Sequence, residues 1–132
     1  MNPGIPKASK SKAVDAPGKL ERSLQWLDLD RNAGDRWIRL DAVGKRFEVA
    51  FEYMWKALKS ALDAQGVEAY GPKDSISSAA SYKWIEDVEQ WVMFLETRNA
   101  GVHDYFGLSE EEYAQTARTF LGDAGKVLQR LP

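Results

Sequence analysis

The chain has 132 residues, which suits a single domain built around one hydrophobic core. It contains no cysteine and only one histidine, so disulfides, thiolate nucleophiles and thiolate metal sites are excluded, and a histidine-built metal cage within one chain is disfavoured. The formal net charge of −2 argues against a general, charge-driven nucleic-acid binder, although it leaves room for a local cationic cleft.

The first segment, residues 1–18, is rich in Pro, Gly, Ser and Lys and lacks the apolar region of a secretory signal. We predict that it is a flexible N-terminal tail, followed by a helical bundle domain over residues 19–130. No apolar run in the sequence approaches the roughly 20 residues that a membrane-spanning helix needs. We therefore expect a cytoplasmic protein that does not bind membranes.

Apolar residues recur at steps of three and four through the domain, which is typical of amphipathic helices. The first helix carries Leu20, Leu24 and Leu27. The second is predicted to run from about Trp37 to Gln65, with Gly66 placed to end it. Its apolar stripe comprises Leu40, Val43, Phe47, Phe51, Met54, Leu58 and Leu62.

The remaining helices are predicted from their first residues. Pro72 opens a short helix, since proline suits the first helical position. Asp87 with Gln90 resembles a capping pair for the next helix, and Ser109 with Glu112 forms a capping box for the last. No alternating strand pattern competes, so the expected fold class is all-α, an antiparallel up-and-down bundle of four long helices and one short helix.

The tetrapeptide RNAG occurs twice. In the first copy, Arg31–Gly34, we predict that Arg31 lies in the last turn of the first helix and that Gly34 closes it in the left-handed conformation. Asp35 would then cap the next helix. Nothing in this copy requires chemistry.

The second copy begins at Arg98, which continues an apolar stripe of Val88, Trp91 and Leu95. A guanidinium on a packing face is costly unless it is paired or opens into a cleft, and we expect Trp91 and Leu95 to line that cleft. A break near Gly101 would let Arg98 and His103 converge, a combination that suits a phosphate group. The alternative is structural: Arg98 pairs with Glu48 or Glu52, and His103 caps carbonyls.

The segment RNAGVHDY, residues 98–105, resembles the R-x4-H-x-Y pattern of the HEPN superfamily of small helical proteins. The branch that it resembles pairs with a minimal nucleotidyltransferase and carries the label nucleotidyltransferase substrate-binding protein. RFEVAFEYMWKALKSAL, residues 46–62, resembles the long second helix of that branch, and WVMFLETRN resembles the segment that leads into the motif. The resemblance extends from about Leu20 to Leu128.

The resemblance implies a HEPN-like helical homodimer that acts as a metal-independent endoribonuclease toxin, with a minimal nucleotidyltransferase as its antitoxin. By position, Arg98 and His103 would be the catalytic pair, and Asn99 would orient the substrate or the motif. Tyr105 would be the residue that the partner adenylylates to inactivate the toxin. The acidic chain fits a structured RNA such as tRNA better than any single strand, and no metal or cofactor is expected.

Chemistry is consistent with these roles. Metal-free RNA cleavage needs a group that accepts the proton of the 2′-hydroxyl and a group that protonates the leaving oxygen, and an imidazole can do either. Because the chain has one histidine, two facing chains would supply both roles.

Two other functions remain open from the sequence. One is a non-catalytic subunit that binds nucleotide or substrate for a nucleotidyltransferase, with Arg98 and Lys56 as anion contacts. The other is a purely structural helical dimer that docks onto a partner. The intact R-x4-H-x-Y pattern favours the ribonuclease over the docking protein, but it separates the ribonuclease from the binding subunit poorly.

Overall fold

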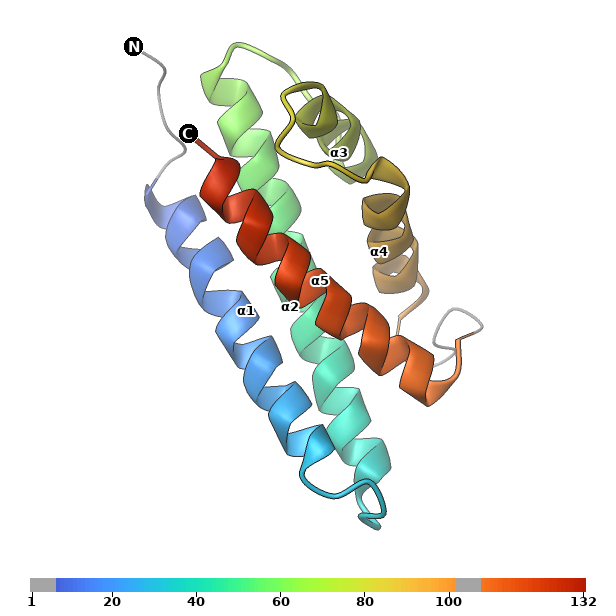
Figure 1. Cartoon of the computed structure of the whole chain (residues 1–132). Coiled ribbons are helices and arrows are strands. Elements are labelled where there is room, and N and C mark those ends of the chain that lie inside the picture. Colours follow the sequence, from blue (N-terminus) through green and yellow to red (C-terminus); the bar gives the residue numbers. More distant parts are fainter. Residues whose placement is uncertain (1–6, 102–107) are drawn as a thin grey trace.

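The computed structural model of the chain describes residues 7–101 and 108–132, and within them all regular structure is α-helical. The five helices are α1 (Lys7–Asp28), α2 (Arg36–Ala64), α3 (Pro72–Ser81), α4 (Val88–Ala100) and α5 (Glu110–Arg130) (Figure 1). The predicted helical bundle, with four longer helices and one short one, is therefore confirmed. The long second helix lies within one residue of its predicted bounds at each end.

Helix α2 is the centre of the bundle, because it contacts each of the other four helices. In Figure 1, α1 and α5 run along α2, whereas α3 and α4 lie on its other side. Every predicted apolar residue of α2 is fully buried. Any site beside α2 therefore stands on the most constrained element of the fold.

The beginning of α1 differs from the prediction of a tail over residues 1–18. Helix α1 begins at Lys7 and runs through Pro17. Ala13 and Ala16 are buried and continue the stripe of Leu20 toward the N-terminus at helical spacing. Because these two residues pack in the core, part of the segment that its composition predicts to be flexible is helical.

The first RNAG copy also differs from its prediction. Helix α1 ends at Asp28, before the copy begins, and Gly34 does not have a positive φ angle. The carbonyl oxygen of Trp26, in the last turn of α1, accepts from the N–H of Leu29 at 3.3 Å and also from the Arg39 guanidinium of α2 at 2.8 Å. A contact from another helix therefore adds to the local turn at the end of α1.

Residues around this copy also have other partners than expected. Arg31 lies in the loop and forms an ion pair of 3.3 Å with Glu111. Asp35 occupies the N-cap position of α2 but makes no side-chain cap bond there; its Oδ1 accepts from Arg39 Nε at 3.0 Å. The interpretation of the first copy as structural is unchanged, because Arg31 ties the loop to α5 and Asp35 pairs within α2.

Three other predicted helix ends are confirmed. Gly66 has a φ angle of 79°, and its N–H donates to the Asp63 carbonyl at 3.0 Å. The N–H of Val67 donates to the Leu62 carbonyl at 2.9 Å, which completes a Schellman motif. The Asp87 carboxylate accepts from the N–H of Gln90 at the start of α4. Ser109 and Glu112 exchange two hydrogen bonds of 3.1 Å, which is the capping box predicted for α5.

We expect Ser109→Ala to lower the free energy of unfolding by about 1 kcal/mol, because the first turn of α5 loses its side-chain acceptor. Urea unfolding followed by circular dichroism measures the change. Ser77→Ala is the matched control, since Ser77 is exposed within α3 and alanine favours a helix. Equal effects of the two substitutions would contradict a stabilising capping box.

Candidate anion-binding site between α2 and α4

One face of α2 forms the floor of a hollow of about 330 Å³. Its residues on α2 form two adjacent rows, Lys45–Val49–Tyr53 and Glu48–Glu52–Lys56, each with steps of four, so they share one side of the helix. Arg98 reaches the hollow from the last turn of α4. The complete lining is Lys45, Glu48, Val49, Glu52, Tyr53, Lys56 and Arg98.

Arg98 is the most enclosed cation of this hollow, with 24% of its side chain exposed. Its Nη2 atom donates to Glu52 Oε2 at 2.7 Å, and its guanidinium carbon lies 5.7 Å from the centroid of the Phe51 ring. Its Nε–H is buried and has no acceptor among the described residues. The pairing with Glu52 is one of the two that the structural interpretation of Arg98 anticipated.

Glu52 is the carboxylate with which two cations of the hollow pair. Its carboxylate also accepts from the Trp55 indole N–H at 3.0 Å and pairs with Lys56 Nζ at 3.2 Å. Burial by itself would raise the pKa of Glu52, but the hydrogen bonds from Trp55 and Lys56 and the charge of Arg98 together lower this pKa below its ordinary value. Glu52 therefore stays ionised at neutral pH and acts as an internal counter-ion.

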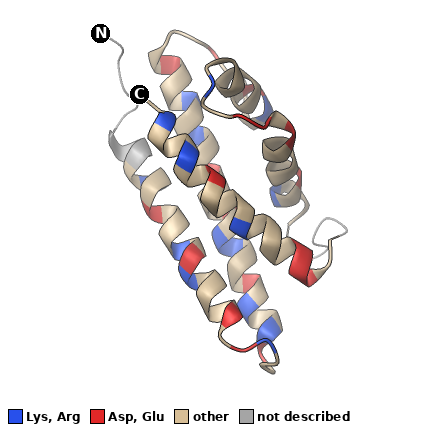
Figure 2. Ribbon diagram, viewed as in Figure 1, with Lys and Arg blue, Asp and Glu red and all other residues tan. Residues whose placement is uncertain are grey.

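The charge of the hollow is opposite in sign to that of the chain. Three cations, Lys45, Lys56 and Arg98, face two carboxylates, whereas the chain as a whole has a net charge of −2. Elsewhere, basic and acidic residues are interspersed along α1, α2 and α5 (Figure 2). A small anion is thus favoured inside the hollow without the molecule being basic overall.

Gly101 sets the direction in which the chain leaves α4. Its φ and ψ angles are 77° and −179°, a combination that is essentially restricted to glycine, and its N–H donates to the Arg98 carbonyl at 3.2 Å. The predicted break of the helix at this position is confirmed. The turn lies next to the hollow, because a Cβ atom on Gly101 would be 3.9 Å from Glu48 Oε1.

We expect Gly101→Ala to destabilise the protein by about 1–3 kcal/mol through backbone strain alone, since the added methyl group meets no close neighbour. Thermal unfolding measures the change. Gly125→Ala is the control: Gly125 lies inside α5 in open space, so the same substitution should stabilise there by about 0.5–1 kcal/mol. Shifts of the same sign would disprove the role of the Gly101 conformation.

The other residues predicted for the site have different outcomes. His103 and Tyr105 lie outside the described residues, so their roles remain predictions. Asn99 is exposed on α4 and does not line the hollow. Trp91 and Leu95 were expected to line a cleft beside Arg98, and this was wrong: both are buried in the core, and α2 supplies the lining instead.

Sequence reasoning missed Lys45, Val49 and Tyr53, whereas it named Lys56 as a possible anion contact. A signal for them existed, because they stand three or four positions from Glu48, Glu52 and Lys56 along the same helix. What the spacing could not reveal is that Arg98 of α4 approaches this face of α2.

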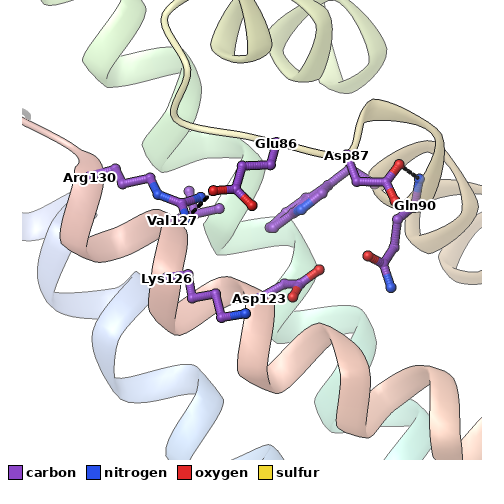
Figure 3. A pocket seen from close by; sticks show the side chains of 8 residues that line it. Glu86, Asp87, Gln90, Asp123, Lys126, Val127 and Arg130 are labelled. Atoms are coloured by element: carbon purple, nitrogen blue, oxygen red, sulfur yellow. Dashed lines mark hydrogen bonds and ion pairs between the residues drawn. The ribbon is translucent and has the colours of Figure 1, made fainter.

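A second hollow, of about 250 Å³, lies between the start of α4 and the end of α5. In Figure 3, Glu86 pairs with Arg130 at 2.8 Å, and Asp87 accepts from the backbone N–H of Gln90 at the start of α4. Arg130 also donates to the Trp84 carbonyl at 3.3 Å. These contacts tie α5 to the segment before α4, and we assign this hollow a structural role.

Metal-binding clusters and membrane-spanning helices are both absent from the described part of the chain. No group of three or more His, Cys, Asp or Glu side chains there is arranged to hold a metal ion. No helix there is both long enough and apolar enough to cross a bilayer.

Comparison with known proteins identifies the family. The family described as "Nucleotidyltransferase substrate binding protein like" matches residues 13–132. The chain belongs to this family. The match begins inside α1, at the buried Ala13, and spans all the helices that build the hollow.

A solved structure is similar to this member of the family. It is the crystal structure of ttk003001694 from Thermus thermophilus, with a TM-score of 0.64 and 26% sequence identity. The alignment covers 89% of this chain and 93% of the other. Among curated proteins, no match is found.

Proposed function

We propose that the chain is a substrate-binding subunit that associates with a nucleotidyltransferase, and that the hollow of Lys45, Lys56 and Arg98 receives a phosphate group of the substrate. Membership of the nucleotidyltransferase substrate binding protein-like family is the observation that carries the proposal. The net positive hollow is consistent with it, because nucleotidyltransferase substrates carry phosphates.

A phosphate would bind by replacing the carboxylate of Glu52 as the partner of Arg98 and Lys56. Without a ligand, Glu52 balances Arg98 and Lys56. A phosphate has three oxygens able to accept from the guanidinium fork and the ammonium group at once, and charge-assisted bonds of this kind are the stronger ones in proteins. The exposed Lys45, which has no ion pair with any described carboxylate, would add a third cation.

The test uses the full chain in EDTA and isothermal titration calorimetry with ATP and inorganic phosphate as probes. Lys56→Ala should weaken the binding of both probes, whereas Lys126→Ala, an exposed lysine beside the second hollow, should not. Co-expression with the small nucleotidyltransferase of the source organism should yield a stable complex. Binding that is insensitive to Lys56, or absent altogether, would refute the assignment of the hollow.

A second candidate is the endoribonuclease, which is favoured by the R-x4-H-x-Y pattern over residues 98–105. Two chains of HEPN-like fold would then face each other, with Arg98 stabilising charge on the scissile phosphate and His103 moving protons. Adenylylation of Tyr105 by the partner would block the site by charge and bulk. Arg98 is paired with Glu52, so this candidate, like the binding subunit, requires the guanidinium to exchange that carboxylate for a phosphate.

The two candidates separate in one assay. Purified protein is incubated with total tRNA in EDTA, beside Arg98→Ala and His103→Ala, and the partner with ATP is then added. Cleavage by the wild type only, with an adenylate mass increase on Tyr105, would establish the nuclease. Intact tRNA with retained partner binding would establish the binding subunit.

A further inference from the structure

A third hollow, of about 360 Å³, lies on the α1 side of the same stretch of α2. It is distinct from the hollow of Arg98 but shares a wall with it, because Val49 and Tyr53 line both. The remaining residues that line it are Lys12, Asp15, Ala16, Lys19 and Arg46.

This hollow has a larger excess of positive charge than the hollow of Arg98. Lys12, Lys19 and Arg46 face a single carboxylate, Asp15. None of the ion pairs within the described residues involves these three cations, although acidic residues outnumber basic ones in the chain. One carboxylate does not balance three cations, so the like charges repel one another, and an external anion relieves that repulsion.

Tyr53 stands between the two groups of cations. On one side, Lys12 Nζ lies 5.6 Å from the centroid of its ring, which holds the α1 ammonium group against α2. On the other side, Tyr53 lines the hollow of Lys56 and Arg98. Lys45 and Lys56 both line the first hollow and stand about 16 Å apart along α2 at 1.5 Å per residue, so that hollow alone is longer than one phosphate group.

From this arrangement we propose that the hollow of Lys12, Lys19 and Arg46 is a second phosphate subsite, and that the ligand is a chain of phosphate groups that crosses Tyr53 from one hollow to the other. The inference rests on the proposed function, since the first hollow holds one end of the chain. Two sources supply such a ligand: the polyphosphate of a nucleotide and the phosphodiester backbone of an oligonucleotide. Both have negative charges spaced along a flexible chain.

The experiment compares three probes on the full chain: inorganic phosphate, tripolyphosphate and a six-nucleotide oligothymidylate. Three variants are used: Lys12→Ala/Lys19→Ala for the second subsite, Lys56→Ala for the first, and Lys126→Ala as an exposed control on a different hollow. Circular dichroism confirms that each variant is folded. Calorimetric titrations at two salt concentrations give the affinities.

We expect the double variant to weaken the binding of the longer probe, whichever of the two binds, by roughly five- to twentyfold. The affinity of the first hollow for inorganic phosphate should be unchanged, since a single phosphate occupies one hollow at a time. If that probe is the oligonucleotide, the slope of its salt dependence should fall by about 0.7 for each phosphate that a lysine no longer neutralises, hence by about 1.4 in the double variant. Selective binding of tripolyphosphate identifies a nucleotide as the source, and selective binding of the oligonucleotide identifies nucleic acid.

The subsite is refuted if the double variant and Lys126→Ala bind the long probes equally well while Lys56→Ala weakens all three. In that case the first hollow, and with it the proposed function, is unaffected. If Lys56→Ala instead leaves every probe unchanged, the proposed function is the part that fails.

Discussion

Phe120→Ala is expected to lower the free energy of unfolding by about 3–5 kcal/mol, the largest single loss of stability that we predict. The Phe120 ring is fully buried in α5 and lies at the centre of an aromatic cluster. Its centroid is 5.3–5.9 Å from those of four other rings, mostly in edge-to-face geometry: Phe47, Phe51, Trp91 and Phe94. These rings belong to α2 and α4, so the substitution opens a cavity where three helices meet.

Urea unfolding followed by tryptophan fluorescence measures this loss, since Trp91 is part of the cluster. Met93→Ala is the control, because Met93 is 42% exposed on α4 and its truncation leaves no enclosed cavity. A Phe120→Ala loss no larger than that of Met93→Ala would show that the cluster does not hold the bundle together. The same cluster supports the hollow, since Phe51 lies beneath the Arg98 guanidinium.

Arg98→Ala and Glu52→Gln are expected to change phosphate binding in opposite directions. Removing Arg98 should weaken binding by about 10- to 100-fold, since hydrogen bonds to charged groups contribute about 1.5–3 kcal/mol. Glu52→Gln should strengthen it, because the competing carboxylate becomes a neutral amide that can still accept from Trp55. Calorimetric titration with inorganic phosphate measures both effects, and weaker binding by Glu52→Gln would contradict the exchange of anions.

The same pair makes a prediction about pH. Because the pKa of Glu52 is lower in the folded chain than its ordinary value of 4.5, its ionised form contributes stability that is fully present above pH 4.5. That contribution is lost as the pH falls through the lowered folded value. Wild type should therefore be more stable than Glu52→Gln at pH 7, and the difference should vanish in acid. A difference that is independent of pH would mean that the effect is steric.

The two substitutions also test how much the pair of Arg98 and Glu52 contributes to the stability of the fold. Arg98 and Glu52 are only partly exposed, so breaking their pair should cost stability even where binding improves. A variant that binds phosphate better but unfolds more easily is the expected result for Glu52→Gln. This outcome would show that Glu52 stabilises the fold by neutralising the cations of the hollow.

Most helix ends could be predicted from the sequence, because the interactions that set them are local. Ser109 and Glu112 are three residues apart, and Gly66 alone meets the steric demand of the turn after α2. The apolar stripe of α2 likewise indicated its buried face before any tertiary contact was known. The end of α1 was not predicted in this way: the helix ends before the first RNAG copy, in a turn where Arg39 of another helix adds a second hydrogen bond to the Trp26 carbonyl.

The sequence by itself indicated the helical fold of the described residues, the bounds of the longest helix, α2, and the place of Arg98 on a packing face. Only the tertiary structure decided that Arg98 pairs with Glu52, 46 positions away, and that Lys12 of α1 lies against Tyr53 of α2. The physical reason is that helical periodicity determines which side of each helix is apolar, whereas long charged side chains choose partners according to how two helices are rotated and shifted against each other.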